Sequence, residues 1–143
     1  MGNGVYVFGG RNSEMDALNT AERYDPESNR WMQLPRMRKK RNGASAAVLD
    51  ERIFVIGGET GSKFMEIFHP RSNQWSFVTQ PNEAHTRAVL YSDNQSLFVF
   101  GGWNGQQWST IVEVYDQKLD QWTIMPQRSN FPIDIWKHIL LTH

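Results

Sequence analysis

Short apolar runs, each closed by two glycines, recur along the chain and divide it into similar units. The runs span residues 5–8, 53–56 and 97–100, and a Gly-Gly pair follows each of them directly. The second glycine of the pair stands at positions 10, 58 and 102, so it recurs after 48 and then 44 residues. β-Branched and aromatic residues ended by glycine indicate strands, and a period of this length indicates an array of supersecondary units.

Each unit contains further short strands that are separated by turns and loops. One strand is predicted at 20–24, 64–68 and 111–115, and another at 30–34, 74–78 and 121–124. Segments 43–49 and 85–91 are predicted strands that precede the second and third glycine-ended strands. We therefore expect four-stranded antiparallel meanders, whose strands we call a to d in chain order, and a first unit that lacks strand a.

Large side chains stand at fixed positions of strands c and d. Strand c carries a Glu and, two residues later, an aromatic residue, whereas strand d carries a Trp. A four-stranded sheet buries both faces only by stacking on its neighbours, so we expect these rings to pack between adjacent sheets. Each Glu belongs to a different sheet, which favours a structural hydrogen bond or ion pair over a catalytic pair. The positions are Glu22, Glu66 and Glu113; Tyr24, Phe68 and Tyr115; and Trp31, Trp75 and Trp122.

Composition narrows the range of partners. The 143-residue chain carries 15 Lys and Arg against 15 Asp and Glu, so its net charge gives no argument for nucleic-acid or membrane binding. It contains no Cys, which excludes disulfides and thiolate metal sites and fits a reducing compartment. Its four His residues are scattered, without the spacing of a metal site. We therefore expect a cytoplasmic protein with no cofactor, no metal, no nucleic-acid partner and no membrane partner.

The repeated residues resemble the kelch repeat, and most closely the kelch-like family, in which kelch propellers follow BTB and BACK domains. This resemblance implies an all-β fold, namely a partial kelch β-propeller of about three four-stranded antiparallel blades, the first without its inner strand. The residues that carry it are the c- and d-strand aromatics above and the glycines Gly9, Gly10, Gly57, Gly58, Gly101 and Gly102.

The expected repeats cover residues 1–42, 43–81 and 82–127, and residues 128–143 are either a degenerate start of a fourth repeat or a C-terminal tail. That last segment is compatible with a closing strand for the first unit or with a short helix. Propellers typically have 4–8 blades. We therefore interpret the chain as a fragment of a longer protein; the alternative is self-association of copies through open blade edges.

In an a–b–c–d meander the d–a and b–c loops emerge at one face, and binding residues are expected on such loops. The basic run 38–41 is a d–a loop and therefore shares this face with the loops that follow the glycine pairs. In kelch-like substrate receptors this face holds acidic segments of client proteins, and Asn82 here stands where the third unit would carry the matching Arg. The resemblance implies a partner-binding set of Arg11, Asn12, Arg41, Trp103 and Asn104.

The function implied by the resemblance is that of a non-enzymatic protein-interaction module. It would be the substrate-recognition part of an adaptor for a cullin-RING ubiquitin ligase, which it would contact through domains absent from this chain. Two alternatives remain open: a cytoskeletal, actin-associated kelch scaffold and a kelch-fold enzyme. The basic run also matches a nuclear-localisation or nucleic-acid patch, although its surroundings are neutral.

Overall fold

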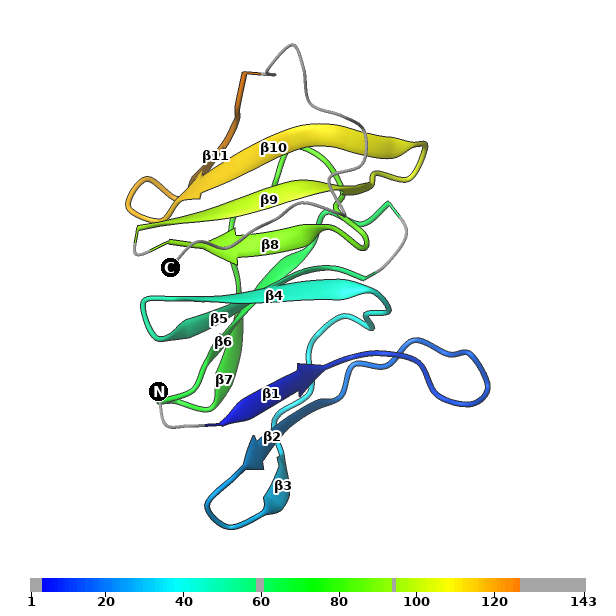
Figure 1. Cartoon of the computed structure of the whole chain (residues 1–143), viewed down its shortest axis with the longest axis vertical. Coiled ribbons are helices and arrows are strands. Elements are labelled where there is room, and N and C mark those ends of the chain that lie inside the picture. Colours follow the sequence, from blue (N-terminus) through cyan, green and yellow to red (C-terminus); the bar gives the residue numbers. More distant parts are fainter. Residues whose placement is uncertain (1–3, 59–60, 94, 127–143) are drawn as a thin grey trace.

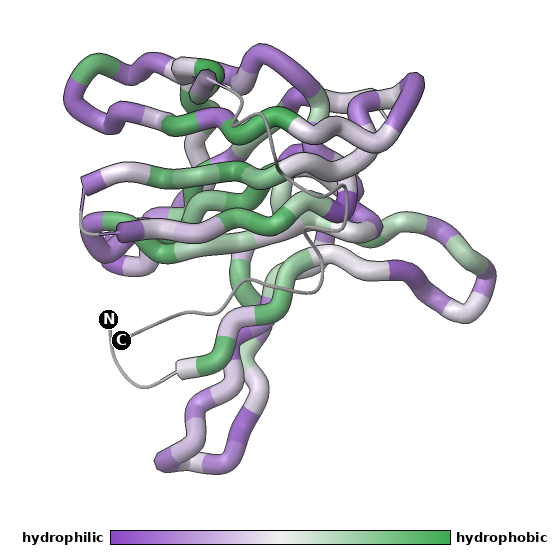
Figure 2. The backbone as a smooth tube through the Cα atoms, turned by 45° about the horizontal axis from the view of Figure 1, so that its top comes forward, coloured by the Kyte–Doolittle hydropathy of each residue, from purple (hydrophilic) through white to green (hydrophobic). Residues whose placement is uncertain are grey.

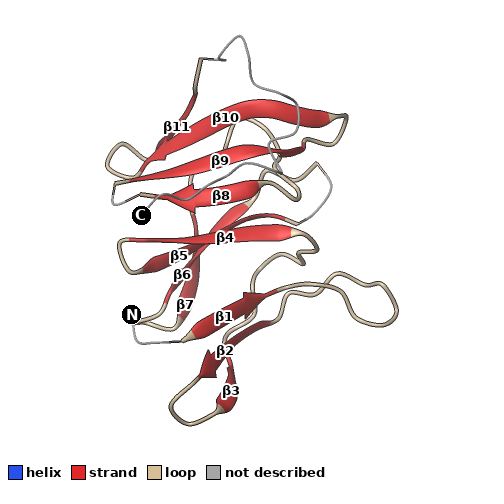
Figure 3. Cartoon of the chain, viewed as in Figure 1, coloured by secondary structure: helices blue, strands red, loops and turns tan. Residues whose placement is uncertain are grey.

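The chain forms three antiparallel sheets that stand one after another (Figure 1). The computed structural model describes residues 4–58, 61–93 and 95–126, and this part contains strands and no helix (Figure 3). The predicted all-β fold is therefore confirmed. Blade 1 contains β1 (Val5–Phe8), β2 (Ala21–Asp25) and β3 (Arg30–Gln33); blade 2 contains β4 (Ala44–Leu49), β5 (Arg52–Gly57), β6 (Met65–His69) and β7 (Gln74–Phe77); blade 3 contains β8 (Val89–Ser92), β9 (Ser96–Trp103), β10 (Trp108–Asp116) and β11 (Gln121–Ile124).

The middle strand β5 explains why the glycine-ended runs are apolar throughout. Side chains alternate across a strand, and both faces of blade 2 are covered. Ile53 and Val55 join the core between blades 1 and 2, whereas Phe54 and Ile56 join the core between blades 2 and 3. Figure 2 shows apolar residues concentrated along the strands and polar residues at the hairpin ends.

Tryptophans on the d strands tie each blade to the blade before it. Trp75 Nε1 donates to the carbonyl of Pro35, which follows β3, at 2.7 Å. Trp122 Nε1 donates to the carbonyl of Thr79, which follows β7, at 2.9 Å. Pro35 lies four residues after Trp31 of blade 1, and Thr79 lies four residues after Trp75 of blade 2. The same contact therefore recurs at both blade junctions.

The glycine pairs allow the next blade to approach closely. Gly57 has φ of 72°, and a Cβ built there would lie 2.2 Å from the carbonyl oxygen of His85. Gly9 lies in the same way against the carbonyl of Arg41, at 2.3 Å from a built Cβ. A side chain would therefore separate the strand b end from the loop that leads into the following blade.

Two predicted boundaries differ from the structure. The strand expected at 85–91 corresponds to β8, which begins only at Val89. The chain bends at Arg87, which has a φ of 57°, so the residues before Val89 do not belong to the strand. In blade 3 the strands continue past the glycine pair, where Trp103 and Trp108 pair across β9 and β10, so the loop is only 104–107. The alternatives for residues 128–143 lie outside the described residues.

Candidate partner-binding site

The b–c and d–a loops form a cleft at one end of the blades, which we call the loop face. The cleft has a volume of about 580 Å³ and receives residues from all three blades. Its lining combines two cations, two indoles and small or polar residues: Ala17, Lys40, Asn42, Gly58, Thr86, Arg87, Trp103 and Trp108.

The cations and indoles of this cleft suit an anionic, partly apolar ligand. Lys40 and Arg87 are exposed and come from successive d–a loops. Trp103 and Trp108 lie edge to face, with ring centroids 5.8 Å apart, and Trp108 is 50% exposed. Guanidinium and ammonium groups donate to carboxylates, and exposed Trp offers a rigid apolar contact surface.

A buried carboxylate on β6 fixes the loop that carries Lys40. Glu66 is fully buried and accepts hydrogen bonds from the backbone N–H groups of Arg38, at 2.7 Å, and Lys39, at 3.2 Å. Arg41 Nη2 donates to Glu66 at 2.9 Å, and its Nη1 donates to the carbonyls of Gly57 and Phe64. Glu66 thus has the structural role that we expected from its repeat position.

The side chain of Arg41 is buried and does not line the cleft. We expected its side chain on the loop face, but it is only 1% exposed and pairs with Glu66. The remaining members of the basic run also have separate roles. Arg38 lies over the ring of Phe77 and Lys39 over that of Phe64, which leaves Lys40 to line the cleft.

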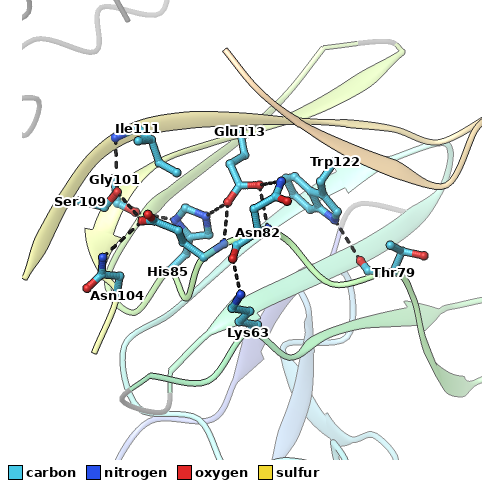
Figure 4. A network of polar contacts seen from close by, with 11 residues as sticks. Lys63, Thr79, Asn82, His85, Gly101, Asn104, Ser109, Ile111, Glu113 and Trp122 are labelled. Atoms are coloured by element: carbon cyan, nitrogen blue, oxygen red, sulfur yellow. Dashed lines mark hydrogen bonds and ion pairs between the residues drawn. The ribbon is translucent and has the colours of Figure 1, made fainter. Parts of the chain in front are cut away.

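Blade 3 repeats this arrangement with different side chains (Figure 4). Glu113 on β10 is fully buried and accepts hydrogen bonds from the N–H groups of Asn82, at 2.8 Å, and Glu83, at 2.9 Å. His85 Nε2 contacts Glu113 at 3.0 Å, and His85 Nδ1 contacts the carbonyl of Gly101 at 2.6 Å. The ring of His85 thus contacts a c-strand carboxylate and a strand b carbonyl, as the guanidinium of Arg41 does in blade 2.

Our assignment of Asn82 to the position of Arg41 was therefore wrong. Asn82 matches Arg38, since its N–H contacts the c-strand Glu, and His85 matches Arg41. Burial favours a raised pKa for Glu113, but the hydrogen bonds from His85, Asn82 and Glu83 outweigh it and lower that pKa. The carboxylate of Glu113 is thus held in its charged form.

Of the predicted partner-binding residues, Asn12 and Asn104 shape their own loops. Asn12 Oδ1 accepts from the N–H groups of Glu14, at 3.1 Å, and Asp16, at 2.9 Å. Asn104 Oδ1 accepts hydrogen bonds from the backbone N–H groups of Gln106 and Gln107, each at 3.0 Å. Such side-chain turns fix loop conformation.

The cleft brings together only part of the predicted set. Trp103 lines it, and Arg11 is exposed on the neighbouring b–c loop, where it pairs with cleft-lining Ala17. Sequence reasoning missed Lys40, Arg87 and Trp108 as binding residues. Lys40 belongs to the basic run, and Trp108 lies in the same polar segment as Trp103, so the sequence offered a reason to consider both. Arg87 lies within the predicted strand 85–91, so the sequence offered no reason to place it in a binding loop.

Residues 4–58, 61–93 and 95–126 hold no group of three or more His, Cys, Asp or Glu side chains that could bind a metal ion. Within the same ranges there is no helix of the length and apolarity needed to cross a membrane.

Successive antiparallel sheets of three, four and four strands, tied by d-strand tryptophans and carrying a cleft on one loop face, define a blade array of the β-propeller class. The family model for the KLHDC2/KLHL20/DRC7 kelch-repeats domain matches residues 1–143. The chain therefore belongs to the kelch-repeat family. This membership supports a protein-interaction module.

Several known proteins are similar to parts of this chain. The chain is 31% identical over 70 residues to an F-box/kelch-repeat protein of Arabidopsis thaliana, which is 46% of this chain and 19% of that one. It is 36% identical over 69 residues to N-acetylneuraminate epimerase of Haemophilus influenzae, strain PittEE. That match covers 45% of this chain and 18% of the epimerase. It is 37% identical over 59 residues to alpha-scruin of Limulus polyphemus. That match covers 41% of this chain and 6% of alpha-scruin. The chain thus matches less than a fifth of the length of each of these relatives.

The solved structure of YjhT has the same fold. It aligns with 88% of this chain and 49% of its own length, with a TM-score of 0.76 and 20% identity. At this identity the likeness concerns the fold alone, and it agrees with a partial kelch propeller.

Proposed function

We propose that this chain recognises an acidic segment of a client protein in the loop-face cleft. The observation that carries the proposal is the convergence of Lys40, Arg87, Trp103 and Trp108 on one cleft of about 580 Å³. The two cations donate to carboxylates, while the indoles cover apolar side chains between them. Arg11 extends the cationic surface along the adjacent loop of blade 1.

Peptide binding tests this proposal directly. Fluorescently labelled 12-residue peptides that combine Asp or Glu with apolar residues should bind, and matched peptides with Lys in place of the acids should not. Lys40→Ala combined with Arg87→Ala should weaken binding at least about tenfold, since hydrogen bonds to charged groups contribute about 1.5–3 kcal/mol each. Arg71→Ala, at the opposite end of the blades, is the matched control, because Arg71 lies at the β6–β7 turn and pairs with Glu51. Equal binding of acidic and basic peptides, or an unchanged affinity in the double variant, refutes the proposal.

We further propose that the recognised client is delivered to a cullin-RING ubiquitin ligase. The kelch-like resemblance and the F-box/kelch-repeat relative support this role, which needs domains outside the described chain. The natural full-length protein should then co-purify with a cullin, and Lys40→Ala with Arg87→Ala should lengthen the half-life of the bound client without reducing cullin recovery. Recovery of actin in place of a cullin would favour the scaffold alternative.

The epimerase relative makes catalysis a testable second candidate. Among the described residues, those that line the cleft include no carboxylate, imidazole or thiol, so they supply no matched acid–base pair. We therefore propose binding without turnover. Incubation with N-acetylneuraminate, followed by NMR, should show no change of anomer beyond the uncatalysed rate; acceleration that disappears in Lys40→Ala would overturn this.

A further inference from the structure

Two aromatic side chains are exposed beside the loop face, at the junction between blades 1 and 2. Phe64 directly precedes β6 and is 40% exposed, whereas Phe77 is the last residue of the edge strand β7 and is 45% exposed. Their ring centroids lie 6.0 Å apart. Because this junction lies inside the array, between two described blades, the exposure of the two rings does not depend on where the array ends.

Two cations from the loop that joins blades 1 and 2 lie over these rings. Arg38 Cζ is 5.1 Å from the centroid of the Phe77 ring, and Lys39 Nζ is 4.3 Å from that of Phe64. The quadrupole of each ring attracts the cation above it and so restrains its position. Among the described residues, neither Arg38 nor Lys39 forms an ion pair. We call these four residues, Arg38, Lys39, Phe64 and Phe77, the rim platform.

The loop that carries these cations does not depend on their side chains for its conformation. It is fixed to Glu66 by the main-chain N–H groups of Arg38 and Lys39. Asn82 and Glu83 make the same main-chain contacts with the c-strand carboxylate of blade 3. The frame therefore accepts other side chains at both positions, and the two cations of the rim platform are free for another role.

The aromatic pair also departs from the repeat. Phe77 is paired with the c-strand Glu of its blade, and Phe64 precedes that Glu by two residues. The same pairing and spacing identify the counterparts, which are Gln33 and Thr20 in blade 1 and Ile124 and Ile111 in blade 3. Among the described blades, exposed rings under cations thus occur at one junction only, as do the cations and indoles of the cleft.

The basic run connects the rim platform to the cleft. Its loop leaves β3 at the outer edge of blade 1 and enters β4, whose Ser45 Oγ donates to the carbonyl of Ala88 in the d–a segment of blade 3. Lys40 lines the cleft, and Lys39 and Arg38 precede it toward the outer edge. The Cα atoms of Arg38 and Lys40 are at most about 7 Å apart, so two or three extended residues of a ligand span them.

We propose that the rim platform is a second contact site for the acidic client segment, adjoining the cleft. This inference rests on the proposed function. An apolar side chain of the client packs on the exposed rings of Phe64 and Phe77, and an acidic side chain next to it pairs with Arg38 and Lys39. Charge complementarity favours this occupant, because cations follow one another without interruption from Arg38 to Lys40. The rings hold the cations in place before binding, which lowers the entropy lost on binding.

Fluorescence polarisation with matched peptides and the 143-residue protein tests the proposal. The core peptide is Glu-Asp-Leu-Glu-Asp-Leu. Extended peptides add Gly-Phe-Glu-Phe to one end or the other, and the control peptides add Gly-Ser-Gly-Ser at the same ends. One of the two Phe-Glu extensions should bind at least about fivefold more tightly than its Gly-Ser control, through the charged hydrogen bonds and the ring contacts that it adds.

Two double variants should remove this gain and leave the affinity for the core peptide within about twofold. Phe64→Thr with Phe77→Gln introduces the residues that blade 1 carries at these positions. Arg38→Asn with Lys39→Gln removes the cations but keeps the main-chain contacts with Glu66. Ile124→Gln is the matched control, because Ile124 is the 47% exposed counterpart of Phe77 at the next junction; it should keep the gain.

The outcomes separate this inference from the function on which it rests. If the core peptide does not bind the unmodified protein, the proposed function fails and this inference fails with it. If the core peptide binds but neither Phe-Glu extension exceeds its control, or if the gain survives both double variants, only this inference fails. A dimer in sedimentation equilibrium that dissociates in Phe64→Thr with Phe77→Gln would assign the platform to a second copy and also overturn it. Circular dichroism and Trp75 fluorescence check that the variants are folded, and the Arg38→Asn, Lys39→Gln variant decides if the aromatic one is not.

Discussion

The buried Arg41–Glu66 pair provides the sharpest test of how the blades are held together. Arg41→Ala removes the guanidinium that donates to Glu66 and to the carbonyls of Gly57 and Phe64. Glu66 then keeps two backbone donors but loses the cation that pairs with it, while remaining fully buried. Removing one partner of a buried ion pair costs about 3–5 kcal/mol.

That loss is large compared with the stability of a domain, which is about 5–15 kcal/mol. Urea titration followed by the fluorescence of buried Trp75 measures it, since the midpoint falls in proportion to the loss when the slope is unchanged. Lys40→Ala, in the neighbouring exposed position, is the control and should change stability by less than about 0.5 kcal/mol. Arg41→Lys keeps the charge without the fork and should fall between them. A loss below about 1 kcal/mol in Arg41→Ala would refute the structural role of this pair and reopen the assignment of Arg41 to partner binding.

Three further predictions concern the repeat. Tyr115→Phe should cost about 0.5–1.5 kcal/mol in urea titration, because Tyr115 Oη donates to Asp120 at 2.7 Å; a stability equal to wild type would contradict this. The pKa of Glu113 lies below its ordinary value of 4.5, so its contribution to stability is present above that pH and is lost as pH falls through the lower folded-state pKa; an acid titration should show this loss, and Glu113→Gln should flatten it. Gly57→Ala should destabilise far more than Gly10→Ala, because a Cβ at Gly57 meets a carbonyl at 2.2 Å and one at Gly10 meets nothing within 4 Å; similar melting temperatures would count against the close-approach role of the first glycine.

The fold could be predicted from the sequence because its signals are local and repeated. Three features have a fixed place within a unit: the glycine pair, the c-strand aromatic residue and the d-strand tryptophan. A strand or turn found in one unit therefore predicts the corresponding strand or turn in the next unit. The turn residues agree with them, since Asn29, Asn73 and Asp120 all have positive φ at the same position of the c–d turn. The local preferences of the residues for strands and turns, and the spacing of the sequence repeat, therefore indicated the same architecture.

The site could be predicted only in part, because side-chain direction in the loops depends on contacts distant in sequence. Arg41 and Lys40 are adjacent basic residues, yet one is buried and one lines the cleft. What separates them is the docking of their loop on Glu66, which is 25 residues away from Arg41. The match between Arg41 and His85 was missed for a related reason. Guanidinium and imidazolium groups can both donate to a carboxylate and a carbonyl, so the repeat preserves the interaction rather than the residue type.

The cleft arises where the units differ from one another. Lys40 is matched in the next d–a loop by Ala84, which is 2% exposed, and Arg87 is matched in the previous one by Gly43, which shares its positive φ. The two cations thus occupy non-equivalent positions of the repeat, and Trp103 follows a glycine pair where the first unit has Arg11. A ligand held by non-equivalent contacts can bind in one orientation only, because no rotation by one blade superposes the charges. The repeat therefore supplies the rigid frame, and the recognition that we propose would depend on the residues that depart from it.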